Sequence, residues 1–169
     1  MKNIFINATL VLIILTLFSG CDSTDKGNSG TTGSKAIEPA MIISREDAKA
    51  LTGVTFDECT VKEQPAVGLK LCAYEKDGVF LQLGLTQAAN MKGGNTPESI
   101  YSAIKGGFKD AAKIAGLGDD NFIAPPGVHI MKDGYYLTVS LGLIAKDRDK
   151  LQAAGMKAVE NLGKYTQKK

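Results

Sequence analysis

Two segments of the chain alternate apolar and polar residues with a period of two, which is typical of strands that bury one face. The segments span residues 79–86 and 135–143. Asp77-Gly78 and Asp133-Gly134 stand directly before them, and such dipeptides strongly favour two-residue hairpin turns. The pattern therefore predicts two β-hairpins whose first strands are residues 69–74 and 127–131.

Three other segments space their apolar residues as amphipathic helices do. Ser44 and Asp47 predict the start of a helix that ends at Gly53. Thr96 predicts the start of a second helix, which is expected to bend at Gly106-Gly107 and to end at Gly116. A third helix is predicted for residues 147–162, with Gly163 as its end. The residues expected to face inward from this helix are Leu151, Ala154 or Gly155, Ala158 and Leu162.

The helix and hairpin patterns occur twice. Residues 75–85 resemble 131–141 at an offset of 56, and residues 46–53 resemble 109–116 at an offset of 63. Duplication and convergence both account for this likeness. The sequence predicts an α+β domain at 37–169 with a curved antiparallel sheet, helices packed on one face, and two related helix–hairpin units.

The N-terminal part of the chain is divided sharply by Cys21. Residues 4–18 are almost entirely apolar, and residues 22–35 contain no large apolar side chain. An apolar run of about 15 residues is short for a bilayer span and suits a signal peptide. Secretion with a free Cys21, or an uncleaved anchor, are the alternatives to the interpretation that follows.

This arrangement resembles the lipobox of bacterial lipoproteins, although Phe18 occupies a position where leucine is usual. The resemblance implies that a signal peptide, 1–20, is removed and that Cys21 is acylated with palmitate-like chains. Residues 21–36 then form the lipidated cysteine and a flexible tether. The expected location is the cell envelope, lipid-anchored to the membrane on the extracytoplasmic side, facing the periplasm or the cell surface.

The two remaining cysteines, Cys59 and Cys72, are expected to form a disulfide. Pro65-Ala66 lies midway between them, so a hairpin that turns there would bring the two thiols together. Outside the cytoplasm a pair of thiols is usually oxidised. A metal site is not expected, because the chain has no C-x-x-C motif and a single histidine.

The charge of the domain argues against nucleic acid as a partner. Residues 37–169 carry 17 Lys/Arg and 16 Asp/Glu, without a basic cluster of the kind that binds a phosphate backbone. His129 is the only imidazole available for a catalytic triad, and alternation places it on the polar side of its strand. Asp119-Asp120-Asn121 lacks the ligand spacing of a calcium loop. Neither a cofactor nor enzymatic activity is expected.

The polar face of the predicted strands is the candidate interaction surface. Phe80 and Tyr136 occupy equivalent positions in the two units, accompanied by Gln82 and Thr138. If no helix covers this face, two aromatic side chains over polar neighbours would bind a protein partner or a small ligand. The sequence thus favours a non-enzymatic interaction or sensor module. The alternatives are a carrier of a small hydrophobic ligand, which requires an apolar cavity, and a hydrolase, which requires converging ionisable groups.

One family resemblance extends over most of residues 37–162. The two-cysteine hairpin, Tyr74 after the second cysteine, and the Gly116-Leu117-Gly118-Asp119 turn before a hydrophobic strand are similar to the DUF3558-like class of bacterial lipoprotein and extracytoplasmic sensor domains. That class usually has tryptophan after the second cysteine, and its first cysteine opens the initial helix. The resemblance implies location and fold, since no activity is assigned to the class.

Overall fold

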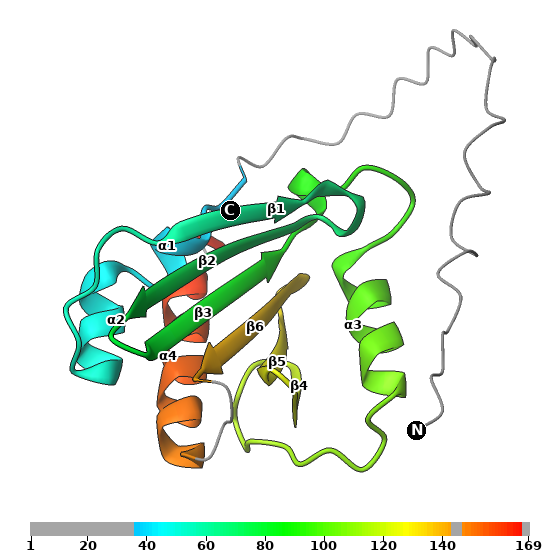
Figure 1. The fold of residues 1–169 in the computed structure, drawn as a ribbon. Helices are drawn as coiled ribbons and strands as arrows, with labels where there is room; N and C mark the ends of the chain where they lie inside the picture. Colours follow the sequence, from blue (N-terminus) through cyan, green and yellow to red (C-terminus); the bar gives the residue numbers. More distant parts are fainter. Residues whose placement is uncertain (1–35, 143–146, 167–169) are drawn as a thin grey trace, which may run out of the picture. The chain divides into compact units, whose positions relative to one another are not determined.

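The computed structural model describes residues 36–142 and 147–166, and its centre is an open antiparallel sheet (Figure 1). The spatial order of the strands is β1-β2-β3-β6-β5-β4. Their bounds are β1 Thr60–Gln64, β2 Leu69–Lys76, β3 Val79–Thr86, β4 Asp120–Ala124, β5 Gly127–Lys132 and β6 Tyr135–Leu141. The helices are α1 Pro39–Ile42, α2 Arg45–Thr52, α3 Pro97–Gly106 and α4 Arg148–Thr166, with short 3₁₀ turns at Pro65–Val67 and Ala88–Asn90. The α+β class and the antiparallel sheet predicted from the sequence are confirmed.

The two halves of the sheet are related by an approximate two-fold axis. Strands β3 and β6 pair with Leu83 opposite Val139, and these two residues are separated by the same offset of 56 that relates the two hairpins. The axis therefore passes between them, perpendicular to the sheet. Asp77 and Asp133 adopt φ values of 51° and 50°, so the two predicted hairpin turns have the same left-handed backbone.

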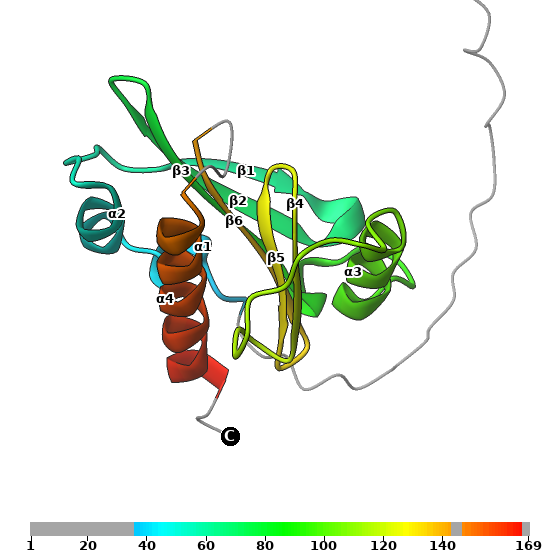
Figure 2. The same ribbon diagram turned by 90° about the horizontal axis from the view of Figure 1, so that it is seen from below.

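The first face of the sheet carries the main core, beneath α1, α2 and α4. Leu81, Leu83, Leu85, Leu137 and Val139 are fully buried there, as their alternation predicts. Figure 2 shows α4, α1 and α2 on one side of the sheet and α3 on the other. The predicted inward-facing residues of α4, Leu151, Ala154, Gly155, Ala158 and Leu162, are all buried against this core, and the helix adds Val159 and the buried Asn161, which were not predicted.

The second face carries a smaller core beneath α3. Tyr101 of α3 packs there with Phe122, Met131 and Tyr136 from the strands. The expectation that all helices pack on one face is therefore wrong for α3. Residues 109–116, which resemble α2 in sequence, form no helix, so the likeness between the units does not extend to their helices.

Helix α3 is shorter than the sequence predicts. It begins as expected at Thr96, whose side chain accepts a hydrogen bond from the Ser99 amide. It ends at Gly106 instead of continuing to Gly116, because two adjacent glycines each cost the helix about 1 kcal/mol relative to alanine. The following loop is held by the buried Asn121 side chain, which bonds to the backbone of Ile114 and Leu117.

Both ends of α2 are as predicted, but the C-terminal end of α4 is not. Ser44 and Asp47 form the expected capping box of α2, and Gly53 ends that helix with a left-handed φ of 81°. Gly163 does not end α4, which continues to Thr166. The side chain of Lys164, just after Gly163, bonds to the side chains of Glu160 and Asn161, just before it. These contacts connect the last turn of the helix to the turn that precedes the glycine.

The hairpin of β1 and β2 carries the predicted disulfide. Cys59 and Cys72 are bonded, their Cα atoms lie 5.4 Å apart, and they are 13 residues apart in the sequence. The chain reverses at Pro65–Val67, as expected. The predicted signal peptide, Cys21, the tether and Leu143 lie outside the described residues. None of the helices in the described residues has the length and the apolar composition that a membrane span requires.

Candidate functional site

The four predicted interaction residues lie on the second face of the sheet but not at one place. Tyr136 is opposite Thr86 in the β3–β6 pairing, six residues along β3 from Phe80. At about 3.3 Å per residue, this separates the two aromatic side chains by ~20 Å. The expectation that Phe80 and Tyr136 form one surface is wrong, because positions related by the two-fold axis lie at opposite ends of the central strands.

The two halves of the second face also differ in exposure. Tyr136 is only 4% exposed beneath α3, whereas Phe80 and Gln82 are partly exposed. Thr138 is partly exposed and lies opposite Gly84. The half around Tyr136 is therefore a covered half-face, and the half around Phe80 is an open one.

His129 lies at the centre of the covered half-face. Its ring stacks on Phe122 with centroids 4.5 Å apart and an interplanar angle of 5°. Its Nδ1 is hydrogen-bonded to the Tyr136 hydroxyl at 2.6 Å. Tyr101 of α3 meets Tyr136 edge-on at 5.5 Å. Alternation predicts the side of the strand correctly, but His129 is 4% exposed because α3 covers that side.

Burial fixes the protonation states of this cluster. It lowers the pKa of His129, against a smaller opposing effect of the carbonyls of Pro125 and Ala124. It raises the pKa of Tyr136 to about 12, against the opposing hydrogen bond with Thr138. The imidazole and the phenol are therefore both neutral near pH 7. The ring of His129 therefore packs as a neutral imidazole among the aromatic side chains beneath α3, and its Nε2 is buried without a hydrogen-bond partner among the described residues.

Tyr101 is the residue of this cluster that the sequence pattern does not predict. The apolar residues of this helix with helical spacing are Ile100 and Ile104, whereas the residues buried against the sheet are Pro97 and Tyr101. The spacing of Pro97 and Tyr101 could have indicated this side, because residues four apart lie on the same side of a helix. Apolar periodicity alone favours the neighbouring stripe, which is only partly buried.

A shallow hollow of about 370 Å³ lies beside Tyr101, where α3 meets β4. Its lining residues are Tyr101, Ser102, Lys105, Gly106, Lys109 and Asp120. Lys105 and Lys113 both bond to the Asp120 carboxylate, with the Lys113 Nζ at 2.9 Å. Burial favours the neutral acid, but these hydrogen bonds outweigh it and hold the pKa of Asp120 well below its usual range.

The other members of the Asp119-Asp120-Asn121 sequence bond within the protein. Asp119 accepts hydrogen bonds from the Asp133 amide at 2.7 Å and from Lys132 at 3.0 Å. Asn121 holds the preceding loop through its side-chain amide. The two Asp119 contacts join the residue before β4 to the β5–β6 turn. Among the described residues, no three histidine, cysteine or acidic side chains gather in a way that could hold a metal ion.

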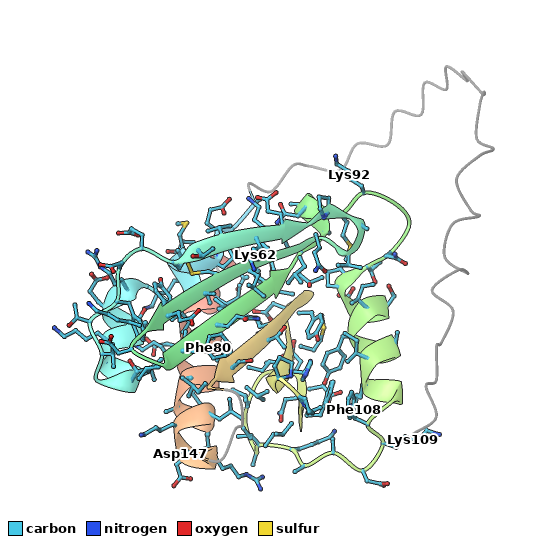
Figure 3. The ribbon with its side chains drawn as sticks, in the orientation of Figure 1. Lys62, Phe80, Lys92, Phe108, Lys109 and Asp147 are labelled. Carbon is cyan, nitrogen blue, oxygen red and sulfur yellow. A yellow bond between two sulfur atoms is a disulfide. The ribbon has the colours of Figure 1, made fainter. Side chains whose placement is uncertain are left out.

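The open half-face lies on β1, β2 and β3, on the side of these strands where none of the helices in the described residues packs. We define it by six residues that share this side of the sheet: Thr60, Lys62, Leu71, Ala73, Phe80 and Gln82. Figure 3 shows Lys62 and Phe80 on this surface, away from α3. At the offset of 56, Phe80 and Ala73 correspond to Tyr136 and His129, the residues that α3 covers in the other half. The open half-face is therefore the uncovered counterpart of a packed surface.

No protein-family model, no curated protein and no solved structure matches this chain. Any function assigned to the candidate sites is therefore argued from the geometry and chemistry of their residues.

Proposed function

We propose that this protein is an extracytoplasmic lipoprotein that acts as a non-enzymatic interaction or sensor module. Cys21 carries the lipid anchor, and the polar segment after it holds the domain near the membrane surface in the cell envelope. The apolar run at 4–18 and the abrupt change at Cys21 support the anchor. The Cys59–Cys72 disulfide supports an oxidising compartment.

The observation that carries the interaction role is the difference between the two halves of the second sheet face. In one half, aromatic residues are packed beneath α3; in the other, the equivalent residues are partly exposed. Leu71 and Ala73 give this open half-face apolar residues on β2, Phe80 adds an aromatic ring at its end opposite Glu75, and Gln82 and Lys62 add polar neighbours. Aromatic and apolar residues beside polar ones are common in protein interfaces. The partner we propose is another envelope protein that packs an apolar helix or loop on this surface.

The carrier and hydrolase alternatives have less support. Helix α4 packs closely on the sheet: a Cβ on Gly155 would lie 3.0 Å from Leu117 and 3.3 Å from Ile130. Such close packing leaves little space for a hydrophobic ligand between α4 and the strands. For a hydrolase, His129 is unsuited because it is enclosed by Phe122, Tyr136 and α3.

The anchor is tested by mass spectrometry of the mature protein purified from its native membrane. The proposal predicts an N-terminus at Cys21 that carries fatty acyl chains. The Cys21→Ser variant should retain residues 1–20 and carry no acyl chain. An unmodified Cys21 in the native protein, or an intact N-terminal segment, would contradict the anchor.

The surface is tested by comparing Phe80→Glu with Lys92→Glu, a change to an exposed lysine outside the open half-face. Each tagged, lipidated protein is isolated from native membranes, and co-purified proteins are quantified. We expect recovery of a specific partner to fall about tenfold with Phe80→Glu, as for loss of an aromatic interface residue, and to be unchanged with Lys92→Glu. Equal recovery with both variants would contradict the role of this surface.

A further inference from the structure

We propose that β1 pairs edge to edge with β1 of a second copy of this chain, so that two sheets join into one across a two-fold axis. The surface used is the backbone edge of Thr60–Gln64, and not a face of the sheet. The proposal goes beyond the interaction surface described above, and it depends neither on that surface nor on the lipid anchor.

The two edges of the sheet differ in what covers them. The loop before β4 covers the β4 edge, where the Ile123 amide donates to the Ala112 carbonyl at 2.8 Å. The Asn121 side chain holds the same loop through the backbone of Ile114 and Leu117. Loops that lie along an edge strand in this way prevent it from pairing with another chain.

The β1 edge has no such cover. Among the described residues, β1 pairs with β2 alone, and no backbone group of Thr60–Gln64 bonds to any other segment. Figure 1 shows β1 at the margin of the sheet, with β2 on its inner side. Alternate residues of an edge strand direct their N–H and C=O groups away from the sheet, so the outer side of β1 is a template for a further strand.

β1 is ordered although it buries little apolar surface. All five of its residues are exposed. The Cys59–Cys72 disulfide and the ion pair of Glu63 with Lys70 fasten it to β2. A strand that is already held in the extended conformation loses little conformational entropy when a partner pairs with it.

The residues of β1 favour a second copy as that partner. Two antiparallel copies related by a two-fold axis place one residue opposite itself. A register centred on Lys62 or on Glu63 would put like charges directly opposite each other, which destabilises a strand pair. A register centred on Val61 places valine opposite valine and Lys62 opposite Thr60. This register buries Val61, which is 51% exposed in the single chain.

The pairing would change the surface that the protein presents. Two six-stranded sheets would join into one sheet of twelve strands. Because the two-fold axis is perpendicular to the joined sheet, the open half-faces of the two copies would lie side by side on the same side of it. A partner that binds there would meet a surface twice as wide.

Disulfide trapping tests the register. Thr60 and Lys62 lie on the second face, whereas Cys72 belongs to the core on the first face, so new cysteines at 60 and 62 point away from the native disulfide. In the proposed register, position 60 of one copy is opposite position 62 of the other, with Cα atoms about 5 Å apart and within reach of a disulfide. Two copies of position 60, or of position 62, are separated by about 8 Å, which is too far.

Thr60→Cys and Lys62→Cys chains with different tags are produced together as full-length protein in the native membrane. We expect a mixed disulfide dimer from the two variants together and loss of this product when either variant is produced alone. The native chain is the control for dimers formed through Cys21, which all three proteins contain.

Substitutions at Val61 test the strength of the pairing without added cysteines. Analytical ultracentrifugation of the full-length protein in neutral detergent measures the dissociation constant of the dimer. Val61→Lys should raise it about tenfold, because an apolar pair is lost and like charges meet at the axis. Mixing Val61→Lys with Val61→Glu should restore a mixed dimer, which also shows that both variants fold. Met156→Lys changes a comparably exposed apolar residue of α4 and should leave the constant unchanged.

A mixed disulfide together with rescue by opposite charges would establish β1 as a self-pairing edge. A protein that stays monomeric in both experiments would overturn the proposal. Equal or higher disulfide yields from either cysteine variant alone would overturn the register centred on Val61, and trapping of a different protein would overturn the second copy as the occupant. Phe80→Glu should leave the dimer intact, so failure of the partner surface and failure of this pairing are distinguishable.

Discussion

His129 is a neutral imidazole held between Phe122 and Tyr136, so its charge is linked to folding. The ordinary pKa of 6.5 applies in the unfolded chain, and burial makes the pKa lower in the folded state. The unfolded chain therefore takes up a proton before the folded one does as the pH falls. Stability contributed by the neutral ring is complete above pH 6.5 and is lost as the pH falls from there toward the folded pKa.

We predict that the free energy of unfolding decreases between pH 7 and pH 5, and that His129→Gln reduces this dependence. Urea denaturation at several pH values measures both. The depressed pKa values of Asp119 and Asp120 affect stability only around and below their ordinary value of 3.8, so they do not contribute in this window. An unchanged slope in the variant would show that folding does not lower the pKa of His129.

Gly127 lies so close to the backbone of Val139 that there is no space for a Cβ atom. A Cβ there would lie 2.9 Å from the carbonyl carbon of Val139 and closer still to its oxygen. Backbone cannot rotate away as a side chain can, so we predict that Gly127→Ala lowers stability by about 1–3 kcal/mol. Gly94→Ala is the matched control, since nothing lies within 4 Å of its added methyl. Thermal denaturation of both variants checks the prediction, and equal melting temperatures would refute it.

At the scale of secondary-structure elements, the features set by local sequence could be predicted and those set by tertiary packing could not. Alternation around Leu83 and the Asp-Gly turns fixes strands and hairpins because each depends on a few neighbouring residues. The side of the sheet that α3 covers depends on Tyr101 fitting against Phe122 and Tyr136, which are distant in sequence. The sequence predicts too long a helix for α3 because the apolar spacing continues beyond the glycines that stop it.

The β1–β2 hairpin depends on its disulfide more than the inner strands depend on any one contact. All five residues of β1 are exposed, so this edge strand buries little apolar surface of its own. In the chain-entropy model, closing a loop of this length stabilises the fold by about 3 kcal/mol. We predict a loss of that order in the Cys59→Ser/Cys72→Ser variant.

Guanidinium denaturation with and without a reducing agent measures this contribution. The native protein should lose stability on reduction, and the double variant should not respond to the reductant. Equal midpoints for the native and double-variant proteins under oxidising conditions would contradict a stabilising bridge.

At the scale of the whole domain, a nearly two-fold sheet carries helices that do not follow its symmetry. Repetition in the sequence predicts equivalent positions for Phe80 and Tyr136, and the sheet register agrees. Their environments differ because, within the described residues, no helix covers the second face of β2 and β3 as α3 covers that of β5 and β6. Sequence analysis could therefore identify Phe80 and Gln82 as surface candidates but could not tell that Tyr136 belongs to a core.

Photo-crosslinking from these two equivalent positions tests the central claim most directly. A photoreactive phenylalanine analogue is placed at position 80 or 136 of the native lipidated protein, and the cells are irradiated. The account predicts a discrete crosslink to another protein from position 80 and only crosslinks within the chain from position 136. No intermolecular product from position 80, or the same products from both positions, would contradict the open half-face as the interaction surface.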